Sequence, residues 1–191
     1  MGCIQEGIGV EFLFMEEVMN PIDNKPIAIM LIGHQYTGKS TFLSRMSDVS
    51  HSDKYFNLDA YLHEEARNRG ISYQEAFNKY VKEADAKLQS DYRRWIDEKQ
   101  NIVIDRTNTT VKSRMRVARP LLKAGYEIWA FIFPNLSDDE IKRRIAMRPD
   151  QPIPFDVVAS FRDKMEPLSE EELRIYDRVD VLTSFGKPLA E

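Results

Sequence analysis

An eight-residue stretch, GHQYTGKS, fits the phosphate-loop pattern G-x-x-x-x-G-K-[ST] without a gap. The glycines let successive backbone N–H groups point at one anion, and the helix expected to follow adds the partial positive charge of its N-terminus. In this pattern the lysine reaches the β- and γ-phosphates, and the hydroxyl after it ligates Mg²⁺. The stretch predicts a site for ATP with Mg²⁺, formed by Gly33, His34, Gln35, Tyr36, Thr37, Gly38, Lys39, Ser40 and Thr41.

Two aspartates are expected beside the bound phosphates. Asp59 should end a short strand in KYFNLDAYL, and Asp105 should end the strand NIVID. The carboxyl ends of parallel strands meet at one edge of a sheet, so both side chains should project where the phosphate loop lies. Asp59 is the candidate base for an acceptor hydroxyl, with a cap of the next helix as the alternative. Asp105 is the candidate Mg²⁺ ligand, with a contact to a substrate-binding arginine or a structural role as alternatives.

Two arginines at the end of a predicted helix are candidates for a lid over the phosphates. Arg144 and Arg148 are four residues apart, so we expect them on one face of that helix. The proline-rich RPDQPIP after them is typical of a closing segment, where cations stabilise charge on the transferred group and closure excludes water. The alternative is a basic helix C-terminus that the helix dipole favours.

The elements that must position these residues alternate between strand and helix patterns. The first strand, Ile27–Ile32, is an apolar run of the kind buried on both faces of a parallel sheet. Ser72-x-x-Glu75 begins the longest helix, whose stripe from Tyr73 to Ile96 is interpreted as core rather than as a surface that stacks bases. Further helices are expected at 39–46, 111–124, 137–148, 155–165 and 169–176, and further strands at 101–105, 126–133 and 178–183.

This alternation predicts an α/β, three-layer P-loop NTPase/kinase fold with a central parallel sheet and a short helical lid. Residues 27–191 should form this one domain, since 191 residues suffice for one core and are few for two. Residues 1–26 are expected to be an extension that packs on the domain, binds a partner or is partly disordered.

Composition and charge limit the expected cellular location of the protein and the kind of ligand that it binds. The chain shows no apolar run of ~18 residues, no secretory signal and only one cysteine, so a cytoplasmic location without a membrane is expected. The formal net charge of −4 argues against a general coat on nucleic acid. Residues 105–148, however, hold ten Lys and Arg against five Asp and Glu. This basic segment indicates an anionic ligand, with a solvated helix face as the alternative.

Four stretches of the sequence resemble the kinase domain of phage polynucleotide 5′-kinase and its relatives: GHQYTGKST, NLDAYL, VIDRTNTTVKSRMRVARPLLKAGYEI and KRRIAMRPDQPIPFDVVASF. The resemblance covers residues 27–165. It implies that Lys39 and Ser40 serve ATP and Mg²⁺. It also implies that Asp59 is the general base and Arg148 the lid arginine at the β- and γ-phosphates. At the acceptor site it implies Asp105, Thr107, Asn108 and Arg114.

One departure from this family bears on the acceptor. The family's motif places an arginine three residues after the general base, where it contacts the acceptor phosphate, but Leu62 stands there in this chain. The departure implies that the acceptor is bound by other contacts than in the family, and that the phosphorylated hydroxyl can be another one than the 5′-hydroxyl. Phage relatives of this type phosphorylate the hydroxymethyl group of 5-hydroxymethyluracil within DNA.

Three functions fit these features. The first is an ATP-dependent kinase whose acceptor is a hydroxyl of nucleic acid, expected to be DNA: a 5′-end or a hydroxymethylated base. The second is a kinase for a nucleoside, nucleotide or small metabolite, which suits the acidic chain as a whole. The third is a nucleotide-binding regulatory module that docks a partner through residues 1–26.

Overall fold

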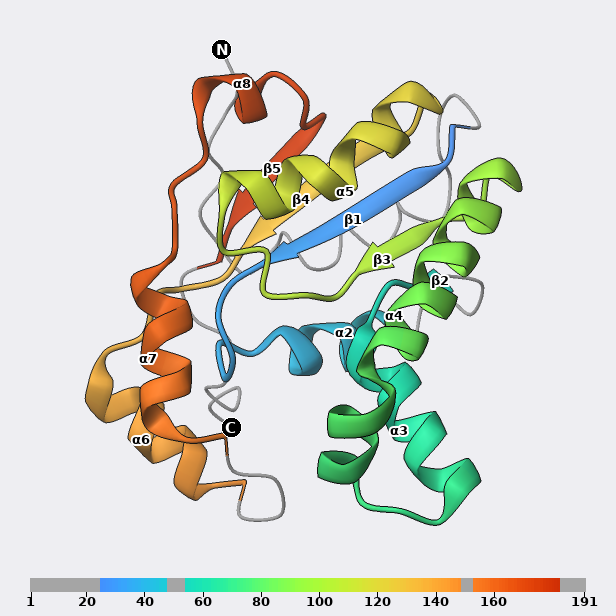
Figure 1. Ribbon diagram of the computed structural model, residues 1–191. Coiled ribbons are helices and arrows are strands. Elements are labelled where there is room, and N and C mark those ends of the chain that lie inside the picture. Colours follow the sequence, from blue (N-terminus) through green and yellow to red (C-terminus); the bar gives the residue numbers. More distant parts are fainter. Residues whose placement is uncertain (1–24, 48–53, 149–152, 183–191) are drawn as a thin grey trace.

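The computed structural model describes residues 25–47, 54–148 and 153–182. Its sheet has five parallel strands in the order β2-β3-β1-β4-β5 (Figure 1), which confirms the predicted α/β fold. The predictions for residues 1–24 and for residues 149–152 of the proline-rich segment lie outside the described residues. The strands are β1 (Ile27–Ile32), β2 (Lys54–Tyr55), β3 (Ile102–Ile104), β4 (Glu127–Ile132) and β5 (Arg178–Val181).

The first strand is the centre of the sheet, and all six of its residues are buried. It pairs in register with β3 on one side and with β4 on the other, with Met30 opposite both Ile104 and Ala130. Side chains alternate along a strand, so the even-numbered residues of β1 join one core cluster and the odd-numbered residues the other. Burial on both faces is the reason for the uninterrupted apolar run.

Helices cover both faces of the sheet. α4 (Tyr73–Asp97) and α5 (Val111–Lys123) pack on the face that Met30 joins, and α2 (Lys39–Ser47) packs through Phe42 on the opposite face (Figure 1). The helices therefore form the two outer layers that the sequence predicts.

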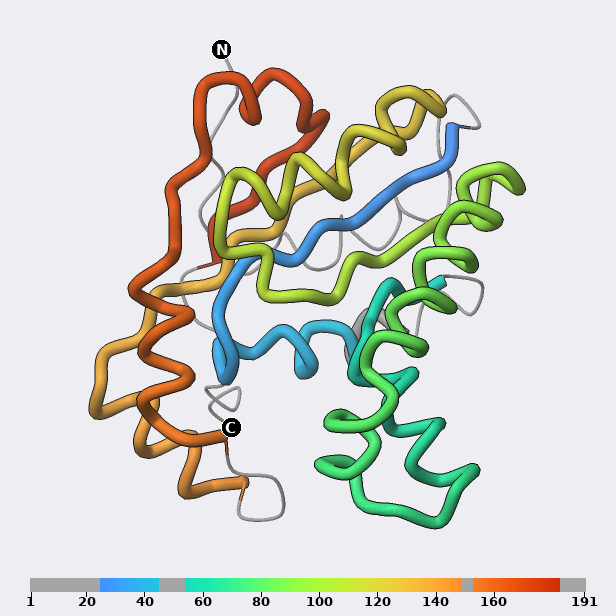
Figure 2. The backbone as a smooth tube through the Cα atoms, in the orientation of Figure 1, coloured from blue at the N-terminus to red at the C-terminus, as the bar shows by residue number. Residues whose placement is uncertain are grey.

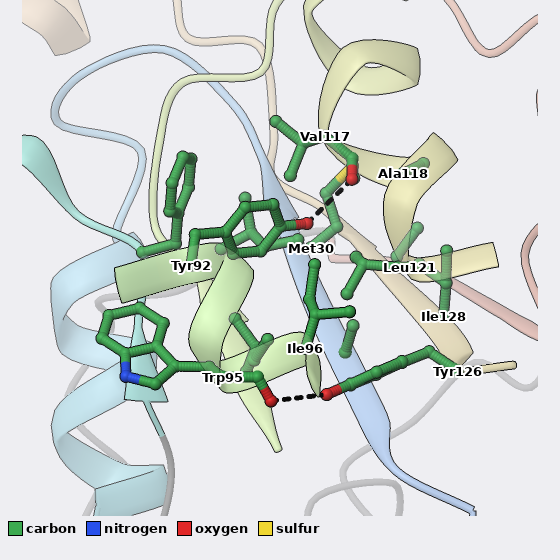
Figure 3. Close-up of a cluster of buried hydrophobic side chains, with 14 of the residues drawn as sticks. Met30, Tyr92, Trp95, Ile96, Val117, Ala118, Leu121, Tyr126 and Ile128 are labelled. Atoms are coloured by element: carbon green, nitrogen blue, oxygen red, sulfur yellow. Dashed lines mark hydrogen bonds between the residues drawn. The ribbon is translucent and has the colours of Figure 1, made fainter. Parts of the chain in front are cut away.

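The core under α4 and α5 includes polar groups that all have partners. Figure 3 shows the tyrosine hydroxyls turned toward backbone carbonyls: Tyr92 donates to Val117 at 2.8 Å, and Tyr126 donates to Trp95 at 3.2 Å. Leu121 fills the space between the two rings and the sheet, and its side chain is fully buried. Buried hydroxyls cost free energy unless they are hydrogen-bonded. The Tyr92 bond therefore fixes α4 against α5, and the Tyr126 bond fixes α4 against the segment between α5 and β4.

Local signals set the helix boundaries near the predicted positions. Ser72 and Ser137 accept backbone N–H bonds from the residues three positions later, and so begin α4 and α6 (Asp138–Ala146). Gly125 follows the end of α5 with a φ of +77°, a left-handed conformation that suits glycine.

Two helical pairs extend past the carboxyl edge of the sheet. One consists of α3 (Leu58–Arg69) and the first half of α4, and the other of α6 and α7 (Phe155–Asp163). They lie on either side of the loop that joins β1 to α2 (Figures 1 and 2). α8 (Glu170–Leu173) lies on the other side of the molecule in this view. The phosphate loop is thus flanked on both sides.

Two details of the sequence prediction are wrong. The strand expected to reach Asp59 ends at Tyr55, and Asp59 lies in the first turn of α3, because Asn57 caps that helix and starts it early. The stripe on α4 is core only in its second half, from Ala84 onward; Phe77, in the first half, is 42% exposed. That half lies beyond the sheet, where it packs on α3; Ala76 is buried there, but Phe77 is left partly open to solvent.

Candidate active site

The phosphate loop (Gly33–Ser40) is held in shape by close backbone contacts. The Gly33 N–H donates to the Thr107 carbonyl at 2.9 Å, which ties the loop after β1 to the loop after β3 (Figure 2). A β-carbon on Gly33 would lie 2.8 Å from the β-carbon of Phe133, a separation that real side chains do not adopt. Gly38 has a φ of +104°, which favours glycine. Both glycines of the motif are thereby required by geometry.

Lys39 is the cation of this loop. It opens α2, and its ammonium donates to the carbonyls of Gly33 and His34, both at 2.7 Å. Burial lowers the pKa of Lys39 to about 8, and the negative charge of Asp105 acts in the opposite direction. The ammonium is therefore charged at neutral pH, and it is held within the loop by carbonyls that an incoming phosphate can replace.

His34 is a buried, neutral residue that links the phosphate loop to the segment after β4 by hydrogen bonds. Its Nδ1 bonds the Gln35 carbonyl at 2.7 Å, and its Nε2 accepts the N–H of Leu136 at 3.3 Å, which requires the tautomer with the proton on Nδ1. Burial lowers the pKa of His34 to about 4, a shift that the Gln35 bond opposes in part. Protonation would cost the Leu136 bond.

This histidine predicts a pH dependence of stability. The folded state binds the proton with a pKa of about 4, whereas the ordinary value is 6.5. The unfolded chain thus holds more protons between these two values, and the His34 contribution is complete above pH 6.5 and is lost as the pH falls to 4. The shift corresponds to roughly 3 kcal/mol at most. In urea titrations at several pH values, the His34→Asn variant should lose stability less steeply than the wild type over this interval; parallel curves would contradict the assignment.

The two candidate carboxylates lie near each other but in different surroundings. Asp105 directly follows β3, is half-buried, and accepts a 2.7 Å bond from the side-chain amide of Asn57 on its Oδ2. Burial raises the pKa of Asp105, and the charge of Asp59 adds to the rise. Asp59 is exposed and accepts a 2.6 Å bond from the Tyr73 hydroxyl. Tyr73 therefore orients a carboxylate that solvent and substrate can reach.

The lid arginines differ from each other in the structure. Arg144 donates to the Tyr36 carbonyl at 2.8 Å and to Glu140 at 2.5 Å, so α6 touches the phosphate loop directly. The Tyr36 hydroxyl accepts the N–H of Ile153, at 2.9 Å, from the segment before α7. Arg148 lies beyond the end of α6, exposed, so the expectation of one shared helix face is wrong. Because Arg148 follows the end of α6, the helix does not set the direction of its side chain, whereas Arg144 is held by its bond to the phosphate loop.

Asn108 and Arg114, both expected at the acceptor site, are buried in structural roles. Asn108 has a φ of +48°, and its amide donates to the Leu31 carbonyl at 2.8 Å. Arg114 is fully buried and makes two bonds to the Glu172 carboxylate, at 2.5 and 3.0 Å. Its guanidinium also donates to the backbone carbonyls of Asn108, Thr109, Glu166 and Pro167. Arg114 thus holds the loop after β3 to the segment around α8, and its guanidinium has no face left for an acceptor.

Arg114 predicts a large stability effect. Removing one partner of a buried ion pair leaves the other uncompensated, which costs about 3–5 kcal/mol. Arg114→Met should lower the free energy of unfolding, measured by urea denaturation, by that amount. Arg119→Met is the control, because Arg119 is exposed on the same helix and such changes stay within about 0.5 kcal/mol. A stability of Arg114→Met close to that of the control would show that this pair does not hold the fold.

Sequence reasoning missed Asn57 and Tyr73 as site residues. Asn57 both caps α3, where its Oδ1 accepts the Ala60 N–H at 3.2 Å, and bonds Asp105 through its amide. An asparagine just before a helical pattern is a recognisable cap signal. Tyr73 lies 14 residues from Asp59, and only the antiparallel packing of α3 on α4 brings the two together.

The strand order, the loop and the flanking helices define a P-loop NTPase/kinase fold. The chain belongs to the AAA domain family, whose sequence profile matches residues 29–168. No match was found among curated proteins. No helix in the described part of the chain is long and apolar enough to cross a membrane.

Solved structures share this fold at low sequence identity. A candidate kinase from Chloroflexus aurantiacus is 18% identical, with a TM-score of 0.60, over 83% of this chain and 88% of its own. A fungal RNA kinase is 17% identical, with a TM-score of 0.54, over 83% and 75%. A sugar kinase from Janibacter sp. HTCC2649 is 15% identical, with a TM-score of 0.53, over 83% and 84%. At these identities the likeness concerns the fold.

Proposed function

We propose that the protein is an ATP-dependent kinase that transfers the γ-phosphate to a hydroxyl of nucleic acid. One observation carries the phosphotransferase part: a phosphate loop with its lysine lies at the same sheet edge as a reachable carboxylate, Asp59, and a half-buried one, Asp105. Phosphoryl transfer needs little more than a positioned hydroxyl, a base and cations around the transferred group.

The chain's own residues have defined tasks in this reaction. Asp59, oriented by Tyr73, accepts the proton of the acceptor hydroxyl as its oxygen attacks the γ-phosphorus. The bond from that phosphorus to the bridging oxygen breaks, and ADP leaves. Lys39 pairs with the β- and γ-phosphates, and Arg148 reaches them from the lid, while Arg144 holds the lid on the loop.

Ser40 and Asp105 fit the requirements of a magnesium site. Mg²⁺ prefers oxygen ligands and often takes only one or two from the protein, with phosphates and waters as the others. Among the described residues, no hydrogen bond occupies the Oδ1 of Asp105, and no group of three His, Cys, Asp or Glu forms a metal cage. When bound, Mg²⁺ would neutralise charge on the phosphates.

The nucleic-acid acceptor is supported by a basic stripe on α5. Lys112, Arg116, Arg119 and Lys123 recur at helical spacing and are all exposed. Such a row suits a phosphate backbone rather than a single small anion. Both the 5′-hydroxyl and the hydroxymethyl group of 5-hydroxymethyluracil in DNA are acceptors of the proposed kind. The solved structures that share this fold include a fungal RNA kinase.

A kinase for a nucleoside, nucleotide or other small metabolite is the second candidate. It is favoured by the net charge of −4 and by the occurrence of the same fold in a sugar kinase.

Labelled ATP and a panel of acceptors test the function. The panel holds 5′-hydroxyl DNA and RNA strands, DNA with 5-hydroxymethyluracil, nucleosides, nucleotides and sugars. Label should appear on an oligonucleotide, and acceptor binding should weaken steeply with salt. Label only on a small molecule, with little salt dependence, would replace the first candidate with the second.

A further inference from the structure

A groove between α4 and α5 holds two arginines. Its larger part, a pocket of about 460 Å³, is lined by Leu58, by Lys82 and Asp85 of α4, and by Arg106 and Arg116 among others. A smaller pocket of about 150 Å³ shares both arginines and continues along the hydroxyl-bearing segment at the start of α5. The two arginines lie where the pockets meet, and the whole is here called the arginine groove.

The charges of the arginine groove favour an anion. Lys82, Arg106 and Arg116 face a single carboxylate, Asp85, among the residues that line the larger pocket. Within the described residues, neither Arg106 nor Arg116 has a carboxylate at ion-pair distance. Burial lowers the pKa of Arg106, and the charge of Arg116 lowers it further, whereas Asp85 and Asp59 oppose the shift. Two like charges at one place are unfavourable until an anion lies between them.

Arg106 is held in place for such a contact. Its guanidinium lies over the buried ring of Phe56, 5.5 Å from the ring centre. A guanidinium supported on one face by an aromatic ring keeps its N–H groups at the edges, where they can make paired bonds to phosphate oxygens.

Two residues that line the arginine groove are chain neighbours of the candidate carboxylates. Arg106 is next to Asp105, and Leu58, which lines the larger pocket, is next to Asp59. The charge of Asp59 acts on both Asp105 and Arg106, so the three lie close together. A molecule in the groove that brings a hydroxyl to Asp59 therefore places its neighbouring group against the two arginines.

We propose that Arg106 and Arg116 bind a phosphate of the acceptor. This inference rests on the proposed kinase function and narrows it: the acceptor is a phosphate ester, a nucleotide or a strand of nucleic acid, and a neutral sugar or nucleoside lacks the group that the arginine groove binds. Both residues are positioned to set specificity through acceptor affinity.

Acceptor kinetics of Arg106→Gln, Arg116→Gln and the double variant test this inference. Each single change should raise the acceptor KM about tenfold, which is the size expected for one charge-assisted hydrogen bond. The change should fall on the acceptor KM rather than on kcat. Arg174→Gln is the control, since Arg174 is exposed beside α8, away from the phosphate loop (Figure 1), and its KM should equal that of the wild type. Arg116 is exposed on α5, so Arg116→Gln keeps a folded test available.

Direct binding gives a second readout. A 5′-hydroxyl oligonucleotide labelled at its 3′-end, followed by fluorescence anisotropy, should bind with a salt slope that the double variant lowers by about 0.7, the value for one phosphate contact on a single strand. The acceptor kinetics of the wild type and the three variants are also measured with a nucleoside monophosphate as acceptor.

The outcomes distinguish failure of the arginine groove from failure of the proposed function. An active wild type on oligonucleotides, with acceptor KM unchanged in all three variants, overturns the role of the arginines and leaves the function standing. A wild type that ignores oligonucleotides but uses a nucleoside monophosphate, with loss in the variants, overturns the nucleic-acid acceptor and upholds the arginine groove. A wild type that phosphorylates only neutral acceptors overturns both.

Discussion

Replacement of Lys39 by alanine is expected to lower ATP turnover about a thousandfold, the upper range for loss of one preorganised donor at a charged transition state. The ammonium already lies inside the phosphate loop, bonded to two of its carbonyls, and no other lysine side chain among the described residues bonds that loop. ATP affinity should fall as well, because the cation pairs with phosphates in both the ground state and the transition state. A coupled assay for ADP measures the turnover, and the rise of the melting temperature on addition of ATP measures the affinity.

Lys25→Ala is the matched control for this change. Lys25 precedes β1 and thus lies at the opposite edge of the sheet, where its ammonium forms a 3.8 Å ion pair with Glu127. The ATP turnover of the Lys25→Ala variant should match that of the wild type. If Lys39→Ala kept wild-type ATP affinity and turnover while folded, the loop would not be a phosphate site.

Replacement of Asp59 by asparagine should lower kcat by about 10²- to 10⁴-fold, the range for loss of a general base. Asparagine keeps the size of the side chain and an oxygen for the Tyr73 hydroxyl, but it cannot take the acceptor proton. ATP affinity should stay within about twofold, since Asp59 is placed to act on the acceptor rather than on the nucleotide. Steady-state kinetics with calorimetry of ATP binding separate these quantities.

Asp91→Asn is the control for Asp59. Asp91 accepts a 2.8 Å bond from the Tyr61 hydroxyl, so it tests the loss of charge in a tyrosine–aspartate pair of the same two helices. Its kcat should be unchanged. A collapse of ATP binding in Asp59→Asn would instead identify Asp59 as a structural or metal-binding residue.

The parts of the fold that depend on local sequence were predictable. The apolar run of β1 and the spacing of the phosphate loop are each contained in a few residues, and the structure has strand and helix at the predicted places. Helix starts at Ser72 and Ser137 follow from a hydroxyl that accepts a nearby N–H, again a local property.

The errors arise where a distant contact or the extent of the sheet decides. Arg114 carries a basic side chain in a helix, which a sequence alone leaves open to a substrate role. Its burial depends on Glu172, 58 residues later, whose carboxylate makes a buried arginine tolerable. Phe77 continues the apolar stripe of α4, but that helix is longer than the sheet that it covers.

The displacement of Asp59 from a strand end to a helix start has a different cause. Two signals compete in KYFNLDAYL: alternating apolar residues favour a strand, and Asn57 favours a helix cap. The cap wins because Asn57 also bonds Asp105, so one side chain satisfies a helix terminus and a buried carboxylate together. The aspartate still reaches the predicted edge of the sheet.

Titration calorimetry of ATP, with Mg²⁺ present, into the folded wild type at pH 7 tests most directly whether the loop holds a nucleotide by its phosphates. We expect saturable heat with one site per chain, and its loss in Lys39→Ala. Absence of binding heat from both ATP and GTP, in a protein shown to be folded by its thermal transition, would contradict the phosphate site and with it the kinase function.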